Sequence, residues 1–177
     1  MSPELAKQRY AKTILNPLEW FMTAHQLMFA MRELEPAIEG YWRTMSSAAK
    51  QPTVKIPRFE YNSAYLLLAG FVIENMCKGF LCARLSPDDC AKAERGELPK
   101  RLDRQHRLDD LLEDVGFSIS PSYREILERV QTTLLWLGRY PAPKESENIR
   151  WKSITGADVT MVKSFLKQLG NHVTKKS

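Results

Sequence analysis

Apolar residues recur at helical spacing along most of the chain, and the breaks between these stripes divide it into helices. After Asn16 and Pro17, two residues that favour a helix start, the spacing predicts a long helix over about 17–48. We expect Pro36 to kink or divide this helix, because proline removes a backbone donor. A last helix is predicted over about 155–174.

The segment over about 60–85 is the most apolar part of the sequence. No charged residue lies between Ala64 and Ile73, and apolar side chains surround the predicted helix on all sides, which indicates burial inside a bundle. The run is shorter than the about 20 apolar residues that a membrane span needs, and Glu74 interrupts it. The sequence therefore favours a core helix without membrane association.

Shorter segments lie between these long helices. Residues 86–100 predict a short helix or loop, and an apolar stripe over 108–115 predicts a short helix that Gly116 ends. Residues 120–138 predict an amphipathic helix. No segment alternates with period two for long enough to predict a strand. The pattern therefore predicts an all-α protein, an up-and-down antiparallel helical bundle that forms one domain over 1–177.

Composition agrees with a folded globular protein. Of the 177 residues, 44% are hydrophobic and 27% are charged, which differs from the composition of disordered chains. The net charge of +5 permits contact with nucleic acid or with an acidic partner. Because the N-terminal segment lacks the uninterrupted apolar stretch of a secretory signal, we expect a cytoplasmic protein.

The cysteines give no sign of a disulfide framework or a zinc site. Cys77, Cys82 and Cys90 are odd in number and have no C-x-x-C spacing, so no metal or other cofactor is expected. The first two lie in the apolar segment, where small buried hydrophobic side chains are the favoured interpretation over reactive thiols.

Common catalytic motifs are absent from the sequence. It has no glycine-rich phosphate loop, no G-x-S-x-G and no H-E-x-x-H, which argues against the usual nucleotide hydrolases, esterases and zinc proteases. Among the three histidines, His25 lies in a stripe rich in methionine and phenylalanine, and His172 lies near the C-terminus. Structural or exposed roles are expected for these two, which leaves His106 as the candidate for chemistry.

His106 precedes a predicted helix and has three arginines within five residues, namely Arg101, Arg104 and Arg107. A histidine can exchange protons and a guanidinium can bind phosphate, so the cluster holds the minimum for metal-independent RNA cleavage. In the alternative interpretation, His106 caps the helix or bonds to a core carboxylate, while the arginines are solvated.

Three polar residues stand at the end of the apolar segment, namely Glu74, Asn75 and Lys78. Buried charges are costly unless they are paired, and Glu74 and Lys78 are spaced to pair on one helix face. The functional alternative is that Glu74 orients the ring of His106 from the neighbouring helix, which would increase the basicity of the ring.

Three pieces of the sequence resemble the HEPN-like superfamily (higher eukaryotes and prokaryotes nucleotide-binding). The pieces are A-Y-L-L-L-A-G-F-V-I-E-N-M-C-K-G at 64–79, H-R-L-D-D-L-L at 106–112 and W-L-G-R-Y-P at 136–141. The resemblance implies an antiparallel helical bundle that is commonly dimeric. Its families include RNases of toxin and phage-defence systems and non-catalytic partners of nucleotidyltransferases.

Many RNases of this superfamily carry an arginine followed a few residues later by a histidine. Arg101 and His106, with four residues between them, fit this spacing and are the candidate catalytic pair. The candidate binding residues are Arg104, Arg107, Arg139 and Tyr140.

Two functions are compatible with these patterns. The favoured one is a non-catalytic binding or regulatory module that forms a homodimer through Trp136, Tyr140 and the methionine-rich first helix. The alternative is a metal-independent RNase of a toxin or phage-defence type that uses Arg101 and His106. The candidate partners besides a second copy are RNA, a nucleotide or a nucleotidyltransferase-type protein.

Overall fold

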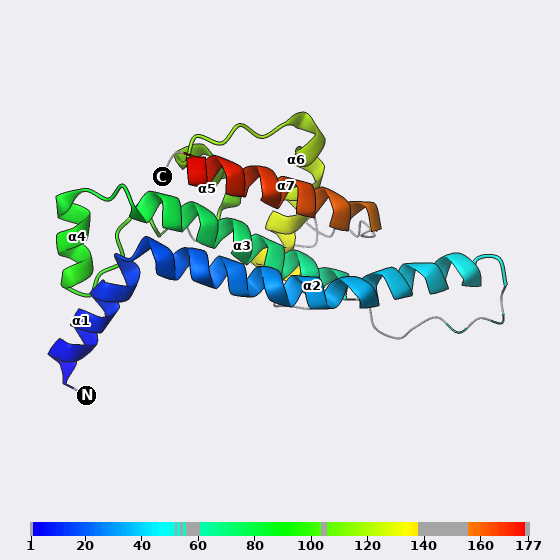
Figure 1. The fold of residues 1–177 in the computed structure, drawn as a ribbon, viewed down its shortest axis with the longest axis horizontal. Coiled ribbons are helices and arrows are strands. Elements are labelled where there is room, and N and C mark those ends of the chain that lie inside the picture. The colour runs from blue at the N-terminus through cyan, green and yellow to red at the C-terminus, as the bar shows by residue number, and fades with distance from the viewer. Residues whose placement is uncertain are drawn as a thin grey trace.

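The computed structural model describes residues 2–51, 53, 55, 61–103, 106–137 and 156–175. Within these ranges the chain forms seven α-helices and one π-helical turn, and it contains no strand, which confirms the all-α prediction. The elements are α1 (Pro3–Ile14), α2 (Pro17–Ala48), α3 (Asn62–Cys82), α4 (Pro87–Glu94), α5 (Leu108–Asp114), α6 (Pro121–Thr132), the π-helical turn η1 (Thr133–Leu137) and α7 (Gly156–Lys175) (Figure 1).

The long helix α2 has the predicted bounds and cap. The Asn16 side chain accepts a hydrogen bond from the amide of Leu18 at 3.1 Å, which satisfies a donor that the helix leaves open. Pro36 lies inside α2 without dividing it, so the helix is continuous over Pro17–Ala48. An internal proline costs about 3 kcal/mol in a helix, and burial of Met31 and Ile38 on either side offsets that cost.

The apolar helix α3 forms the centre of the core, as its sequence predicts. It packs most extensively against α2 and also contacts α5, α6, η1 and α7. By length and composition α3 alone, among the described residues, could cross a membrane, but 72% of its most apolar window is buried inside the protein. Most of the apolar side chains in this window therefore contact other parts of the protein.

The direction of the helices is clear in Figure 1. Helices α2 and α3 run antiparallel, whereas α7 runs in the same direction as α3, so the long helices do not simply alternate. The short helices α4, α5 and α6 separate α3 from α7, so no single short loop fixes the direction of α7. Helix α4 packs beside α1 at one end of the molecule.

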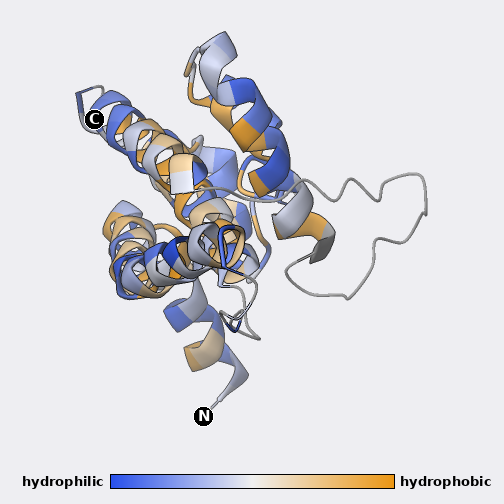
Figure 2. Ribbon diagram, turned by 90° about the vertical axis from the view of Figure 1, so that its right-hand side faces the viewer, coloured by the Kyte–Doolittle hydropathy of each residue, from blue (hydrophilic) through white to orange (hydrophobic). Residues whose placement is uncertain are grey.

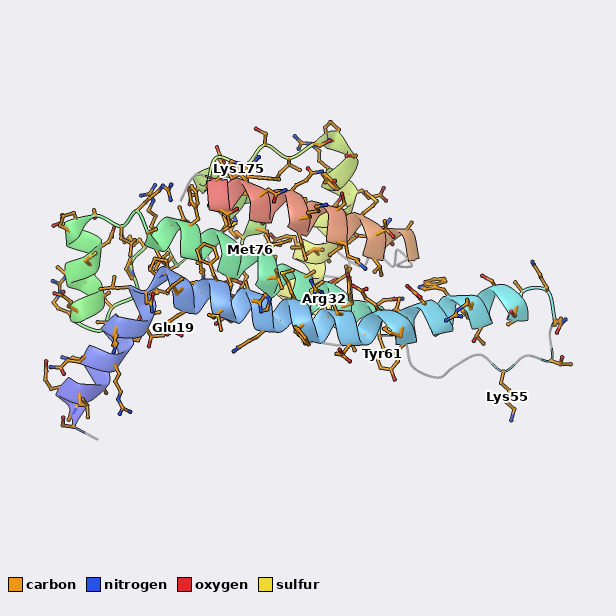
Figure 3. All side chains as sticks on the ribbon, in the orientation of Figure 1. Glu19, Arg32, Lys55, Tyr61, Met76 and Lys175 are labelled. Carbon is orange, nitrogen blue, oxygen red and sulfur yellow. The ribbon has the colours of Figure 1, made fainter. Side chains whose placement is uncertain are left out.

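Apolar residues gather where the helices face one another, and polar residues cover the outside (Figure 2). Side chains fill the space between α3 and α7 (Figure 3). The methyl group of Met76 on α3 lies 4.0 Å from the position that a Cβ atom would occupy if Gly170 on α7 had one. Helix α3 comes close to η1 at Gly70, where an added Cβ would lie only 3.1 Å from Leu134. The missing side chain at Gly70 thus allows η1 to contact the core helix.

Candidate functional site

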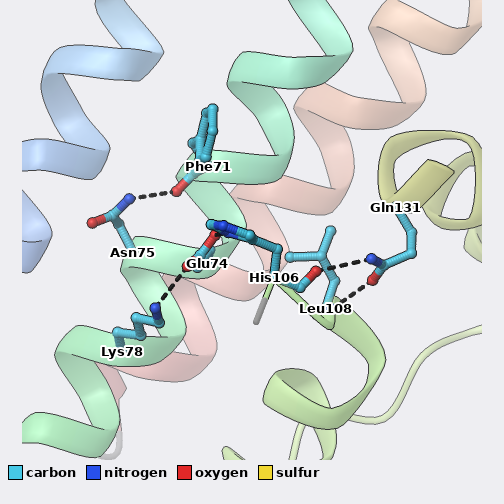
Figure 4. A network of polar contacts seen from close by, with 7 residues as sticks. All are labelled: Phe71, Glu74, Asn75, Lys78, His106, Leu108 and Gln131. Atoms are coloured by element: carbon cyan, nitrogen blue, oxygen red, sulfur yellow. Dashed lines mark hydrogen bonds and ion pairs between the residues drawn. The ribbon is translucent and has the colours of Figure 1, made fainter. Parts of the chain in front are cut away.

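Glu74 is the centre of a buried polar network on α3 (Figure 4). Only 4% of Glu74 is exposed, and its two oxygens have different partners. Oε1 accepts a hydrogen bond from Nζ of Lys78 at 2.6 Å, and Oε2 lies 2.7 Å from Nδ1 of His106. The ion pair expected from the sequence is therefore present, and the histidine contact adds a second partner that offsets the cost of burying the carboxylate.

His106 reaches Glu74 from the loop that precedes α5. A carboxylate only accepts hydrogen bonds, so the geometry favours a proton on Nδ1 of His106. The ring also packs against Phe71 nearly at a right angle, with the ring centroids 5.9 Å apart and the planes at 81°. The His106 side chain keeps 34% of its area exposed, so the ring lies at the boundary between the network and solvent.

The backbone of His106 has a φ of +65°, the only positive value among the described residues other than glycine. This left-handed conformation costs roughly 1–2 kcal/mol for a residue with a side chain. Such strain persists only where surrounding contacts hold it, and it is frequent at functional sites.

Lys78 connects the network to the first two helices. Its ammonium lies 5.6 Å from the centroid of the Trp20 ring on α2, a cation–π geometry. Nε1 of Trp20 donates to the carbonyl of Ile14 at 3.0 Å, and Sγ of Cys82 lies 3.2 Å from the same oxygen. The end of α1 is thus tied to α2 and α3 beside the charged network.

The structure does not bring Arg101 to His106. Nη1 of Arg101 donates to the carbonyl of Arg84 at 3.3 Å, just past the C-terminal end of α3. Arg84 is ten positions after Glu74, which corresponds to about 15 Å along a helix axis. Arg101 and His106 therefore lie near opposite ends of this stretch of α3.

The other predicted residues are only partly described. Nε of Arg107 pairs with Oδ2 of Asp110 at 3.2 Å, and its side chain is 68% exposed. Nδ2 of Asn75 donates to the carbonyl of Phe71 at 2.7 Å, one turn earlier on the same helix. The remaining candidates lie outside the described residues: Arg104, Arg139, Tyr140 and the side chain of Trp136.

Gln131 is a member of the site that no pattern in the sequence singles out. Its Nε2 donates to the carbonyl of His106 at 2.8 Å, and its Oε1 accepts from the amide of Leu108 at 2.6 Å (Figure 4). Gln131 belongs to α6 and lies 25 residues after His106 in the sequence. To select Gln131 from the sequence, one would have had to know that α6 lies beside the start of α5.

The thiols on α3 fit the expected role of buried small side chains. Burial raises the pKa of Cys77 far above its usual range, because a thiolate loses its solvation inside the core. Burial, and to a smaller extent Cys90, raises the pKa of Cys82 to about 11. Among the described residues, no group of three or more histidine, cysteine, aspartate and glutamate side chains is arranged to hold a metal ion.

The two other histidines have different neighbours. His25 is exposed on α2 beside Phe29, and Nε2 of His172 lies 2.9 Å from the carbonyl of Val115 between aromatic rings of the core. The structural or exposed roles expected for both agree with these positions.

Comparison of the chain with protein-family models, with curated proteins and with solved structures found no match. The geometry itself therefore defines the class of site. It is a histidine on a strained loop, held by a buried carboxylate that also binds a lysine. A carboxylate on Nδ1 fixes the tautomer of an imidazole, which suits the histidine for ligand binding or for proton transfer through the other ring nitrogen.

Proposed function

We propose that this chain is a HEPN-like helical module that binds a partner or regulates it as a homodimer, without cleaving RNA itself. The observation that carries the proposal is the separation of Arg101 from His106 along α3. RNA cleavage needs a proton-transfer group and a cation at the same phosphate, within hydrogen-bond reach. A single chain has the histidine without the arginine that its sequence suggested as the catalytic companion.

A binding role is supported by the charge around the site. Arg107 follows His106 directly and is exposed, and the chain carries a net charge of +5. Exposed guanidinium groups suit RNA, a nucleotide or an acidic protein surface. The superfamily resemblance adds a nucleotidyltransferase-type protein to these candidate partners. The proposed location is the cytoplasm, where the three free thiols would stay reduced.

The dimer part of the proposal is supported by α2. Leu18, Met22 and Phe29 are 68%, 55% and 57% exposed, and their spacing puts them on one face of the helix. We call these three residues the apolar stripe of α2. Exposed apolar side chains that cluster in this way mark interaction surfaces, and a twofold dimer uses the same surface of both copies.

The alternative function is a metal-independent RNase, and one observation favours it. The carboxylate of Glu74 on Nδ1 of His106 is the arrangement that prepares a histidine for general acid–base catalysis. In this case a second chain would supply the arginine. The two functions differ in what the purified protein does to RNA.

The deciding experiment incubates the protein with a labelled structured RNA in EDTA and analyses the product ends. Under the favoured function, the wild type and His106→Ala both leave the RNA intact. Products with 2',3'-cyclic phosphate ends that fall by about a hundredfold or more in His106→Ala would establish the RNase instead. His25→Ala is the matched control, because this exposed histidine lies away from the network. A contaminating nuclease would act equally in all three samples.

A further inference from the structure

The strained backbone of His106 must be held by contacts on both sides of the residue. The ring contact with Glu74 fixes the side chain, but it does not fix the carbonyl of His106 or the peptide that follows it. A loop residue with a φ of +65° returns to commoner conformations unless other groups hold those atoms.

Gln131 contacts both the carbonyl of His106 and the backbone that follows it. One carboxamide donates to the carbonyl of His106 at 2.8 Å and accepts from the amide of Leu108 at 2.6 Å. Leu108 is the first residue of α5, and Arg107 at its N-cap provides no side-chain hydrogen bond. Gln131 therefore also satisfies an amide that the start of α5 leaves open.

The position of Gln131 is itself well fixed. Its neighbours Val130 and Leu134 are 1% and 0% exposed, and α6 and η1 both pack against α3. A π-helical turn begins two residues after Gln131, and π-helical turns are frequent at functional sites. The carboxamide thus extends from a well-packed part of the core toward the loop of His106 (Figure 4).

We infer that Gln131 is the residue that positions His106 against Glu74. The contacts reach His106 from two helices, with Glu74 of α3 on the ring and Gln131 of α6 on the backbone. Removal of either contact weakens the hold on the loop. The inference rests on the proposed function in one respect, which is that the ring of His106 belongs to the functional site.

The test compares Gln131→Leu with the wild type by the ring-nitrogen NMR shifts of the histidines. Leucine keeps the approximate size of glutamine and removes both hydrogen bonds. In the wild type, the shifts of His106 should differ from those of exposed His25, because Glu74 fixes one tautomer. In Gln131→Leu, they should move toward the His25 values, since the ring then leaves the carboxylate. The His106→Ala spectrum assigns the signals.

The control variant is Gln168→Leu, which removes another glutamine hydrogen bond, from Nε2 to the hydroxyl of Tyr123 on the surface. It should leave the His106 signals unchanged. Unchanged His106 shifts in folded Gln131→Leu would overturn the inference. If Gln131→Leu fails to fold, Gln131→Glu decides, because glutamate keeps the acceptor for Leu108 and loses the donor for His106. Neither measurement uses RNA or a partner, so the result is independent of the cleavage assay.

Discussion

Glu74 distributes its two carboxylate oxygens between a lysine of its own helix and a histidine from a distant loop. Removal of one partner of a buried charge is costly when the other partner is left without compensation. Here the carboxylate would still keep Lys78 if His106 were replaced. The site therefore tolerates variants of His106 better than variants of Glu74, which would leave the Lys78 ammonium buried without its partner.

The left-handed backbone of His106 gives a test of the stored strain. Glycine adopts this φ without cost, whereas alanine does not, and neither retains the imidazole. We expect His106→Gly to be more stable than His106→Ala by roughly 1 kcal/mol. The measurement is the midpoint of urea unfolding for the two variants.

Glu113 provides the matched control for this pair, because it is an exposed residue inside the helix α5. There glycine should be less stable than alanine by about 1 kcal/mol, the ordinary order in a helix. If glycine were less stable than alanine at position 106 as well as at position 113, the loop at His106 would relax in the variants and store no strain.

The sequence could predict only part of this site. The spacing of Glu74 and Lys78 predicts their ion pair, and a buried carboxylate near a basic loop suggests the contact with His106. Gln131 escaped prediction because a polar residue on an amphipathic helix usually faces solvent. The arrangement of Arg101 was missed for a related reason, since sequence spacing in a loop does not fix where a long side chain points.

At the scale of elements, α3 depends on small residues where other helices come close. A Cβ atom on Gly70 would lie 3.1 Å from Leu134, a residue that is completely buried and has little room to move. The same atom on Gly40 of α2 would have no neighbour within 4 Å. The two glycines thus sit in opposite environments within otherwise similar helices.

Alanine at these two positions should change stability in opposite directions. Gly40→Ala should raise the free energy of unfolding by about 0.5–1 kcal/mol, because alanine loses less chain entropy than glycine when a helix forms. Gly70→Ala should lower the free energy of unfolding by roughly 1 kcal/mol, because the cost of overpacking against Leu134 exceeds the entropic gain of alanine in a helix. Thermal unfolding of both variants checks this. Stabilisation of both would mean that η1 moves away from α3 without cost.

Sequence patterns predicted the long elements well and the irregular ones poorly. The bounds of α2 agree with the predicted range, because an asparagine cap and a proline mark its start. The helix α1 was not predicted, since its charged and apolar residues alternate without a wide apolar face and Ala11 is its only buried residue. The π-helical turn η1 was predicted as regular helix, because one apolar stripe continues through it.

At the scale of the whole molecule, the apolar stripe of α2 tests the proposed dimer. Phe29→Ser removes the most bulky side chain of the stripe while leaving the buried face of α2 intact. We expect dimer dissociation to become at least about tenfold easier, since aromatic residues at interface centres contribute strongly. Sedimentation velocity at micromolar concentrations measures the change.

Leu5→Ser is the matched control for Phe29→Ser, because Leu5 is a large apolar residue that is 42% exposed on α1, away from the stripe. It should leave the association unchanged. A wild type that stays monomeric would contradict the dimer, and equal association of Phe29→Ser and the wild type would assign the interface to another surface.

Trp20 has a further consequence for experiments on this protein. Its indole lies 5.6 Å from the ammonium of Lys78 and donates a hydrogen bond to the end of α1. Indole fluorescence responds to the electric field of nearby charges. A ligand that separates Lys78 from Glu74 therefore shifts the emission wavelength of Trp20. Trp20 is thus an optical reporter of the polar network that needs no chemical label, and a Trp20→Phe variant separates its signal from the emission of the other three tryptophans.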